Sequence, residues 1–421
     1  MSWFTDARFG LFVHWGIYAA AARHEWVKSY EKLDDAHYRR YFDHFDPDLY
    51  DPEVWVDEAW NAGMRYLVIT TKHHDGFCLW DSALTDYKAT ATPYGKDLLR
   101  PMLDAFRARG MRIGLYHSLI DWHHPEFPID LYHPRRDLGE DGTRDVRKYA
   151  DYLHGQVREL LTGYGPIDTM WFDFSYPGRG MGAKGKDEWR SAELEAMVRE
   201  LQPGIMINNR LDLGSGDFTT PEQVMPPGGV PGHVPWEACQ TLNGSWGYDR
   251  DNLDWKSPEL LLSMLVDTVS KGGNMLLNVG PNARGEFEPR AVERLREIGR
   301  WTRLHGRAVY GAGASEFTPP QDCRYTQRGD RLYLHLLNWP MKHVHLQGLA
   351  GRVEYAQFLH DASEVRVLHV DPHEPGHTYL RGVPEDTLTL QLPVTRPEVA
   401  IPVIELFLRP AASNDPAGQY S

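Results

Sequence analysis

The chain has 421 residues, and its 59 acidic against 45 basic side chains give a formal net charge of −14 at pH 7. A charge of this sign repels polyanions, so the composition argues against a nucleic-acid partner. No apolar run is long enough to cross a membrane, and three widely separated cysteines form neither a disulfide framework nor a zinc signature.

The N-terminus lacks a basic segment followed by an apolar one, as a secretory signal would have. This favours a cytoplasmic protein, although a secreted protein whose leader had been removed would give the same sequence. Residues 9–16, FGLFVHWG, are an apolar run that predicts a first strand with His14 at its end. Glu25 and Trp26 follow in a loop.

A helix is predicted from Asp51 to Gly63, because Asp51 suits the N-cap and a glycine commonly ends a helix. The strand that follows, 66–71, runs into His73 and His74. The alternation then continues with predicted helices at 98–109, 144–161, 188–201, 260–270 and 289–305, and with predicted strands at 112–115, 170–174, 205–210, 234–237 and 274–279.

The stretch 170–174, Met-Trp-Phe-Asp-Phe, surrounds one carboxylate, Asp173, with four large apolar side chains. Such a run predicts a strand that is buried on both faces. An ionised carboxylate is costly in a core, so Asp173 must be paired or lie at the exposed tip of the strand. In an α/β barrel the carboxyl ends of the strands open onto the active site. An Asp that caps the next turn is the alternative.

Strands and helices alternate for some 300 residues, which predicts a (β/α)8-like barrel over residues 1–311. A doubly wound sheet would alternate in the same way, but no Gly-x-Gly-x-x-Gly turn follows the first strand. Beyond it, short predicted strands separated by turns indicate an antiparallel β-sandwich over residues 312–412. These strands are 331–337, 343–349, 364–370, 387–392 and 403–408. Residues 413–421 are expected to be a frayed tail.

Polar residues at the predicted strand ends would converge on one mouth of such a barrel, where two carboxyl groups could cleave a glycosidic bond with retention. Asp173 on a rigid strand suits the nucleophile. Two loop glutamates, Glu222 in Thr-Pro-Glu and Glu237 in Trp-Glu, compete for the acid/base, although a lone loop Glu is most often solvated.

The histidines allow a second interpretation. His14, His73 and His74 are expected to donate hydrogen bonds to sugar hydroxyls and to the nucleophile, and a metal site is the alternative. His73 and His74 are consecutive, so on a strand their side chains would point to opposite faces and make poor joint ligands. We therefore expect no catalytic metal.

Eight motifs occur together and in order: FGLFVHWG (9–16), EW (25–26), KHHDGF (72–77), WFD (171–173), INNR (207–210), WE (236–237), SWGY (245–248) and NMLLNVGP (274–281). The set closely resembles the α-L-fucosidases of glycoside hydrolase family 29 over about residues 3–312. The resemblance implies a (β/α)8-like barrel followed by a C-terminal antiparallel β-sandwich, retaining chemistry and no cofactor. The implied substrate is a fucosylated oligosaccharide or glycoside.

The resemblance also assigns roles to residues. Asp173 matches the nucleophile, and Glu222 looks like the acid/base of several members, so we favour it over Glu237. The implied substrate-binding residues are His14, Glu25, Trp26, His73, His74, Tyr116, Trp171 and Arg210, with Glu237, Trp246 and Tyr248 shaping the pocket. L-Fucose lacks a 6-hydroxyl, so its methyl group needs an apolar wall, which Phe12, Trp26 or Trp246 could supply.

Two alternative functions are compatible with the sequence: a fucose-binding, lectin-like protein with little or no hydrolysis, and a metal-dependent hydrolase. The linkage specificity is left open, and so is the formation of a homo-oligomer. No membrane partner is expected.

Overall fold

The computed structural model describes residues 2–139, 142–230, 234–368 and 383–410. The chain forms two compact units, Met1–Pro258 with Asn274–Gly299 and Glu259–Gly273 with Arg300–Ser421. The division falls inside helix α11 (Pro289–His305). The predicted domain limit at residue 311 stays a prediction, and the predicted tail at 413–421 lies outside the described residues.

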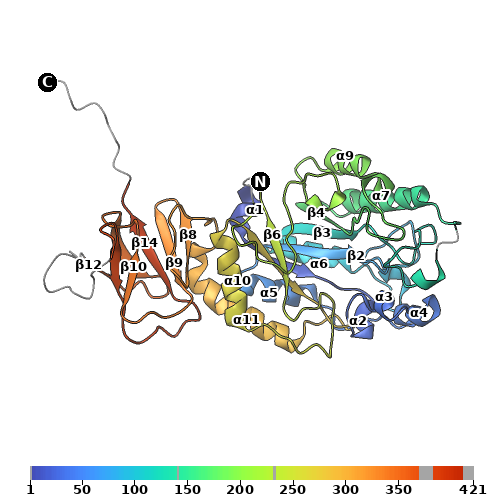
Figure 1. Ribbon diagram of the computed structural model, residues 1–421. Helices are drawn as coiled ribbons and strands as arrows, with labels where there is room; N and C mark the ends of the chain where they lie inside the picture. Colours follow the sequence, from blue (N-terminus) through green and yellow to red (C-terminus); the bar gives the residue numbers. More distant parts are fainter. Residues whose placement is uncertain (1, 140–141, 231–233, 369–382, 411–421) are drawn as a thin grey trace, which may run out of the picture. The chain divides into compact units, whose positions relative to one another are not determined.

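The first unit is built on a parallel sheet of seven strands in the order β5-β4-β3-β2-β1-β7-β6 (Figure 1). The first and last strands of this sheet in chain order are neighbours, since Phe9 of β1 pairs with Met275 of β7. The bounds are β1 Phe9–Val13, β2 Tyr66–Lys72, β3 Arg112–Ser118, β4 Thr169–Asp173, β5 Met206–Ile207, β6 Glu237–Thr241 and β7 Asn274–Val279. The predicted strand at 234–237 therefore starts later than expected.

The gap between β5 and β6 is filled by the segment 217–223. Phe218 forms a parallel bridge with Asn208, just beyond β5, and Glu222 forms one with Cys239 of β6. Backbone hydrogen bonds support this pairing, for example from the N–H of Cys239 to the carbonyl of Pro221 at 3.1 Å. The segment thus takes the place of an eighth strand and closes the barrel, inside a stretch that the sequence presents only as a long loop.

Helices lie outside the strands, with α5 packed beside α6 and α7 beside α9. Helix α5 (Pro52–Ala62) shows the predicted caps: the Asp51 carboxylate accepts the N–H of Glu53 at 2.9 Å, and Gly63 follows with φ 97°. The predicted helix at 188–201 is interrupted at Arg190 and forms two helices. The remaining bounds in this unit are α1 Ser2–Ala7, α2 Tyr18–Ala21, α3 Val27–Tyr30, α4 Asp35–Asp43, α6 Leu99–Ala108, α7 Val146–Gly163, α8 Lys186–Trp189 and α9 Ser191–Leu201.

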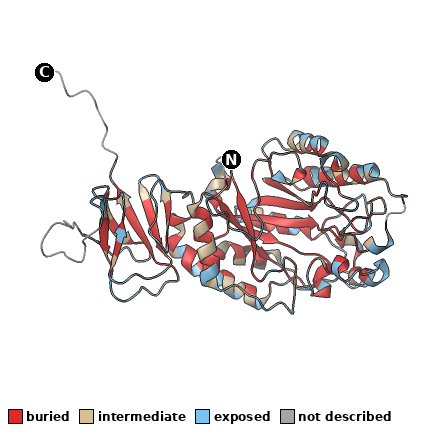
Figure 2. Ribbon diagram, viewed as in Figure 1, coloured by how far each residue is buried: buried red, intermediate tan, exposed pale blue. Residues whose placement is uncertain are grey.

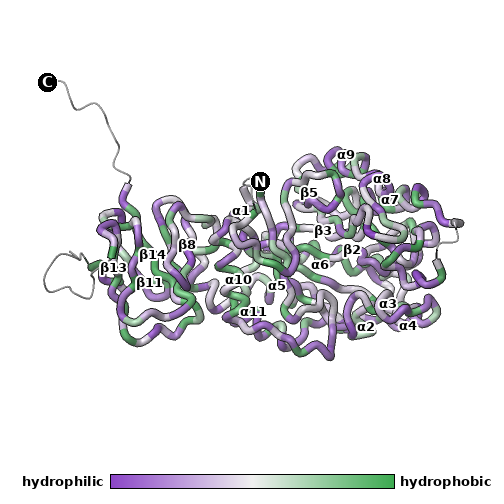
Figure 3. Tube along the Cα trace, viewed as in Figure 1, coloured by the Kyte–Doolittle hydropathy of each residue, from purple (hydrophilic) through white to green (hydrophobic). Residues whose placement is uncertain are grey.

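The barrel interior is filled by alternate residues of the strands. Phe12, Tyr66, Tyr116 and Trp171 belong to one buried cluster there, and the strands are red along their length in Figure 2. The hydrophilic residues, purple in Figure 3, are prominent along the outer helices α7 and α9. Gly10 is required in β1, because a Cβ atom at this position would lie 2.3 Å from the ring of Tyr66.

The second unit contains α10 (Pro258–Ser270) and two antiparallel sheets, in the orders β11-β14-β9-β8 and β10-β13-β12. One apolar cluster joins residues of both sheets, including Leu346 and Leu406, as in a sandwich. The bounds are β8 Cys323–Arg328, β9 Arg331–Leu336, β10 His343–Leu346, β11 Val353–Phe358, β12 Arg366–Leu368, β13 Leu388–Gln391 and β14 Val403–Leu408.

The predicted fold class, a barrel followed by an antiparallel sandwich, is confirmed. Strands β8 and β11 were not predicted, and the last two residues of the predicted strand 364–370 lie outside the described residues. In the described part of the chain, no helix combines the length and the apolar character needed to span a bilayer.

Candidate active site

A cavity of about 280 Å³ opens where the barrel strands end. It is lined by Phe12, His14, His24, Glu25, Trp26, Tyr30, His73, His74, Tyr116, Trp171, Asp173, Phe174, Arg210, Glu222, Cys239 and Trp246. The structure therefore brings together every candidate site residue named from the sequence except Glu237 and Tyr248. The volume lies just below the roughly 300–1,000 Å³ typical of ligand pockets, which suits one small ligand.

Asp173 is the last residue of β4, on the inward face that it shares with Trp171. Its carboxylate accepts a hydrogen bond from the Tyr116 hydroxyl at 2.7 Å and one from Nη1 of Arg210 at 2.6 Å. Burial by itself would raise the pKa of Asp173, but Arg210, His74 and Tyr116 together hold it below its ordinary value. Asp173 is thus an ionised, paired carboxylate at the tip of a strand.

The backbone around Asp173 is fixed from β5. The side chain of Asn208 accepts the N–H of Phe172 at 3.0 Å and donates to its carbonyl at 2.9 Å. This amide takes the place of ladder hydrogen bonds where β5 ends at Ile207. Phe174 follows with φ 78°, a left-handed conformation that costs a non-glycine residue roughly 1–3 kcal/mol. The chain therefore turns away sharply after Asp173.

The same guanidinium contacts a second carboxylate. Nη2 of Arg210 donates to Oε2 of Glu222 at 2.8 Å, and the Arg210 guanidinium lies 4.4 Å from the centre of the Trp171 ring. The Glu222 side chain is 43% exposed, whereas that of Asp173 is 13% exposed. Of the two carboxylates, Glu222 therefore lies on the side of the cavity that is open to solvent.

Glu237 lies at the start of β6, outside the cavity, and is 1% exposed. Both of its oxygens accept hydrogen bonds, one from the Tyr66 hydroxyl and one from Nε1 of Trp171 at 3.1 Å. Burial raises the pKa of Glu237 to about 7. Glu237 does not line the cavity. Its carboxyl group instead accepts a hydrogen bond from the indole of Trp171, which does line it.

His73 and His74 both line the cavity, with ring centres 3.9 Å apart. The expectation that their side chains point to opposite faces is wrong, because β2 ends at Lys72 and the chain turns there. Alternation holds only within a strand. No group of three or more His, Cys, Asp or Glu in the described ranges is arranged to hold a metal ion.

Hydrogen bonding fixes the tautomer of His74. Its Nδ1 lies 2.7 Å from the Ser118 hydroxyl, and that hydroxyl donates its only proton to the carbonyl of Ile120 at 2.7 Å. Nδ1 of His74 must therefore carry the proton. Burial lowers the pKa of His74 to about 4, so the ring is neutral and Nε2 is left as an acceptor.

His14 is fixed in the same way. Its Nδ1 lies 2.7 Å from Oδ1 of Asn278, and Nδ2 of that amide donates to the carbonyl of Trp246 at 2.6 Å. The amide oxygen can only accept, so Nδ1 of His14 donates. Burial lowers the pKa of His14 to about 3. The expected role of His14 and His74 is thus reversed, because these two neutral rings can accept hydrogen bonds from hydroxyls but cannot donate from Nε2.

Glu25 adds another buried acceptor to the cavity. Its Oε2 accepts the N–H of Gly247 at 2.7 Å. Its Oε1 has no hydrogen-bond partner among the described residues, although Nδ1 of His24 lies 3.2 Å away. Burial raises the pKa of Glu25. A buried polar atom left unpaired costs about 1–3 kcal/mol, and a ligand hydroxyl could remove that cost.

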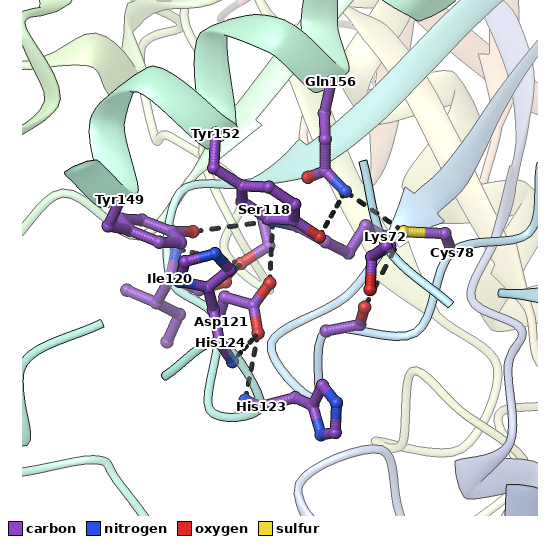
Figure 4. A network of polar contacts seen from close by, with 12 residues as sticks. Lys72, Cys78, Ser118, Ile120, Asp121, His123, His124, Tyr149, Tyr152 and Gln156 are labelled. Carbon is purple, nitrogen blue, oxygen red and sulfur yellow. Dashed lines mark hydrogen bonds and ion pairs between the residues drawn. The ribbon is translucent and has the colours of Figure 1, made fainter. Parts of the chain in front are cut away.

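Figure 4 shows a buried polar network around Lys72 and Asp121, which connects the end of β2 with the loop that follows β3. Lys72 forms an ion pair with Asp121 at 3.2 Å, and one oxygen of Asp121 accepts the N–H groups of His123 and His124, each at 2.9 Å. Burial acts to raise the pKa of Asp121, but Lys72 and the other partners hold it at about 2. The network secures the loop that follows β3 against the end of β2.

That loop reaches the cavity through Trp122. The N–H of Trp122 donates to the carbonyl of His74 at 2.8 Å, and its ring lies 5.1 Å from that of Trp26. Both His74 and Trp26 line the cavity. The loop that the ion pair of Lys72 and Asp121 secures therefore contacts the cavity lining through Trp122.

Sequence reasoning did not assign a role to four lining residues: His24, Tyr30, Phe174 and Cys239. Cys239 could have been found by alternation, since it lies two residues after Glu237 on the inward face of β6, but only the start of that strand was predicted. Nothing local distinguishes His24 and Tyr30 from other loop residues.

Residues 1–307 match the family model described as Alpha-L-fucosidase. The structure is similar to α-L-fucosidase isoenzyme 1 from Paenibacillus thiaminolyticus, with TM-score 0.91, 46% identity and 97% and 98% of the two chains covered. A Bacteroides thetaiotaomicron α-L-fucosidase, solved as a trapped covalent intermediate with 2-fluoro-fucosyl fluoride, gives TM-score 0.84 at 28% identity, with 97% and 96% covered. Tissue α-L-fucosidase of Rattus norvegicus is 30% identical over 368 residues, which cover 80% of this chain and 76% of the relative.

Proposed function

The chain belongs to the α-L-fucosidase family of glycoside hydrolases, and from that premise we propose that it is a retaining exo-α-L-fucosidase acting on terminal α-L-fucosides. The observation that carries the proposal is the placing of Asp173 and Glu222 on one small cavity, both bound to Arg210. Retention requires a nucleophile and an acid/base at one site. Asp173 has the ionised state and the rigid setting of the first, and Glu222 has the exposure of the second.

In the first step, a carboxylate oxygen of Asp173 forms a bond to the anomeric carbon of the fucosyl group. The bond from that carbon to the leaving oxygen breaks, and Glu222 gives its proton to this oxygen. The product is a fucosyl ester of Asp173 with the opposite anomeric configuration. Tyr116 and Arg210 hold Asp173 in one orientation through hydrogen bonds of 2.7 and 2.6 Å, which reduces the motion needed to reach the transition state.

In the second step, Glu222 takes a proton from water, and the water oxygen attacks the same carbon. The bond to Asp173 breaks, its electron pair returns to the carboxylate, and fucose leaves with its original configuration. The Bacteroides thetaiotaomicron relative, whose structure is named a trapped covalent intermediate, supports the proposal that this chain also forms such an ester.

The cavity also supports recognition of one terminal 6-deoxysugar. The acceptor atoms of His14, His74 and Glu25 suit sugar hydroxyl groups, which can donate to them. Phe12 and Trp246 lie on the same wall with ring centres 5.9 Å apart, and this apolar surface suits a methyl group. A sugar carrying a 6-hydroxyl would leave that polar group unpaired there.

We also propose that the protein is located in a reducing compartment. Three cysteines, Cys78, Cys239 and Cys323, are buried and unpaired. This usage is typical of proteins kept in the cytoplasm.

The deciding experiment follows hydrolysis of an aryl α-L-fucoside by proton NMR in real time. We expect α-L-fucose to appear first and β-L-fucose to follow only by slow mutarotation. Initial release of the β-anomer would refute double displacement. Tight fucose binding without turnover would favour the lectin-like alternative, and loss of activity in EDTA with restoration by zinc would favour the metal-dependent one.

A further inference from the structure

Asn278 lies near the end of β7, where it contacts residues of the cavity without lining it, and it is 2% exposed. The sequence motif 274–281 contains this residue but gives it no role. We propose that Asn278 is a positioning residue, which fixes His14 as a hydrogen-bond acceptor and couples it to Glu25 and Trp246. The inference rests on the proposed function, because it takes the cavity as the site that binds the fucosyl group.

The peptide group between Trp246 and Gly247 is held from both sides. Its carbonyl oxygen accepts a hydrogen bond from Nδ2 of Asn278 at 2.6 Å, and its N–H donates to Oε2 of Glu25 at 2.7 Å. A backbone carbonyl can only accept a hydrogen bond, and a backbone N–H can only donate one. The two partners therefore fix the orientation of the peptide group, and this orientation decides how the amide of Asn278 must lie.

The amide of Asn278 transmits that orientation to His14. Because Nδ2 must face the carbonyl of Trp246, Oδ1 must face His14, whose Nδ1 lies 2.7 Å away. An amide oxygen has no proton to donate, so Nδ1 of His14 carries the proton and Nε2 is the acceptor. All three hydrogen bonds donate in one direction, from His14 to Glu25, and bonds in such a chain strengthen one another. The two acceptors of the cavity are thus coupled.

Two glycines allow the peptide group to lie this close to its partners. A Cβ atom on Gly280 would lie 2.7 Å from the carbonyl oxygen of Trp246. A Cβ atom on Gly247 would lie 3.0 Å from that of Glu25. A larger residue at either position would push the peptide group away from the side chains that hold it.

The position of Trp246 depends on the same contact with Asn278. The centre of its ring lies 5.2 Å from that of His14 and 5.9 Å from that of Phe12. The acceptor that suits a sugar hydroxyl and the apolar surface that suits the methyl group are therefore both fixed through Asn278. A change at this residue should weaken the recognition of both groups together.

The alternative is that Asn278 only satisfies a buried backbone group, as Asn274 does on the same strand. Nδ2 of Asn274 donates to the carbonyl of Phe4 at 2.7 Å, and Asn274 is 1% exposed and does not line the cavity. Asn274→Ala is therefore the matched control, because it removes a buried amide from β7 and leaves the contact between Asn278 and His14 in place.

The test measures kcat/KM for an aryl α-L-fucoside and for its 2-, 3- and 4-deoxy analogues. The hydroxyl bound by His14 is the one whose removal no longer lowers kcat/KM in His14→Ala. We expect its removal to lower kcat/KM about 10-fold or more in wild-type enzyme but less than about 3-fold in Asn278→Ala. Asn274→Ala should show the wild-type penalty. Each penalty is a ratio measured on one protein, so a reduced folded fraction cancels.

Two results of this measurement would overturn the proposal. One is the full wild-type penalty in Asn278→Ala at the hydroxyl that His14→Ala identifies. The other is a His14→Ala variant in which every hydroxyl keeps its penalty, because His14 would then accept from none of them.

Gly280→Ala provides an independent check, since it leaves Asn278 and His14 unchanged but pushes the carbonyl of Trp246 away from its donor. We expect the penalty at the same hydroxyl to fall here as well. The wild-type penalty in folded Gly280→Ala would show that the peptide group does not control His14, and the coupling would be refuted.

The position of the proton on His14 tests the proposal without any substrate. In ¹H–¹⁵N spectra, Nδ1 should carry the proton in wild-type protein and in Asn274→Ala, whereas Asn278→Ala should contain both tautomers. An unchanged tautomer in Asn278→Ala would contradict the role of Asn278. If wild-type protein hydrolyses no α-L-fucoside, the proposed function fails, and these spectra still decide whether Asn278 positions His14.

Discussion

Arg210 contacts Asp173 through Nη1 at 2.6 Å, and the two residues come from neighbouring elements, η3 (Asn209–Leu211) and β4. The other terminal nitrogen of the same guanidinium contacts Glu222. One rigid, planar cation therefore sets the relative positions of the two acidic side chains. Since Glu222 is carried by the segment that closes the barrel, the proposed pairing of Asp173 and Glu222 depends on barrel closure.

Replacing Asp173 by glycine should abolish turnover of an aryl α-L-fucoside, by roughly a thousand-fold or more. Added azide should occupy the vacated space, restore part of the rate and give β-L-fucosyl azide, identified by NMR. Asp104→Ala, which removes an exposed carboxylate from α6, serves as the control and should retain full activity. Near wild-type turnover in Asp173→Gly would contradict the assignment of the nucleophile.

Replacing Glu222 by alanine should lower kcat/KM for substrates with poor leaving groups by about 10²–10⁴-fold, with a smaller loss for an aryl fucoside. Here azide should attack the fucosyl ester and give α-L-fucosyl azide, because the first inversion has already occurred. Glu237→Ala is the comparison, and since that carboxyl lies outside the cavity it should form no azide product. Rescue of Glu237→Ala instead of Glu222→Ala would exchange the two assignments.

The proton of His74 should be found on Nδ1. Long-range ¹H–¹⁵N spectra should show an unprotonated Nε2 for this ring, and His305 provides an internal reference because its Nδ1 donates to the carbonyl of Trp301 at 2.9 Å. Ser118→Ala should release the tautomer and lower kcat/KM about 10-fold, whereas Ser118→Thr should preserve both. A His74 ring protonated on Nε2 in the wild-type enzyme would disprove the assignment.

The pKa of Glu237 is raised to about 7 from its ordinary value of 4.5. Its stabilising contribution is therefore complete below about pH 4.5 and is lost as the pH rises through 7. Glu237→Gln imitates the protonated group, so wild-type protein should lose stability relative to this variant by about 3 kcal/mol across that interval. Urea unfolding monitored by tryptophan fluorescence at pH 5 and pH 8 measures the change. An equal difference at both pH values would show that Glu237 is ionised throughout.

Lys72→Met should destabilise the protein by about 3–5 kcal/mol, because it leaves the Asp121 carboxylate buried without its cation. Lys32→Met breaks an exposed pair with Asp137 and should cost less than about 1 kcal/mol. Since the pKa of Asp121 is depressed to about 2, its contribution is lost as the pH falls from about 4 to 2, and the difference between wild type and Lys72→Met should shrink over that interval. Equal effects of the two lysine variants would refute the role of the network.

The order of strands and helices could be predicted from the sequence because local residue patterns specify each element. The cap at Asp51 and the apolar run around Asp173 are each complete within a few residues, and the inward face of a strand follows from a period of two. The motifs likewise identified most of the residues that line the cavity. The family resemblance added the roles of those residues, which remain proposals.

The tertiary structure alone decided which of two loop glutamates faces the cavity. Glu222 does so because residues 217–223 pair with β6, and Glu237 does not because Tyr66 and Trp171 hold it behind the wall. The sequence by itself determined the strand that carries Asp173 and the types of side chain at its tip. Their orientation and protonation depend on partners far away in the chain, and contacts of that kind leave no periodic signal in the residues on either side.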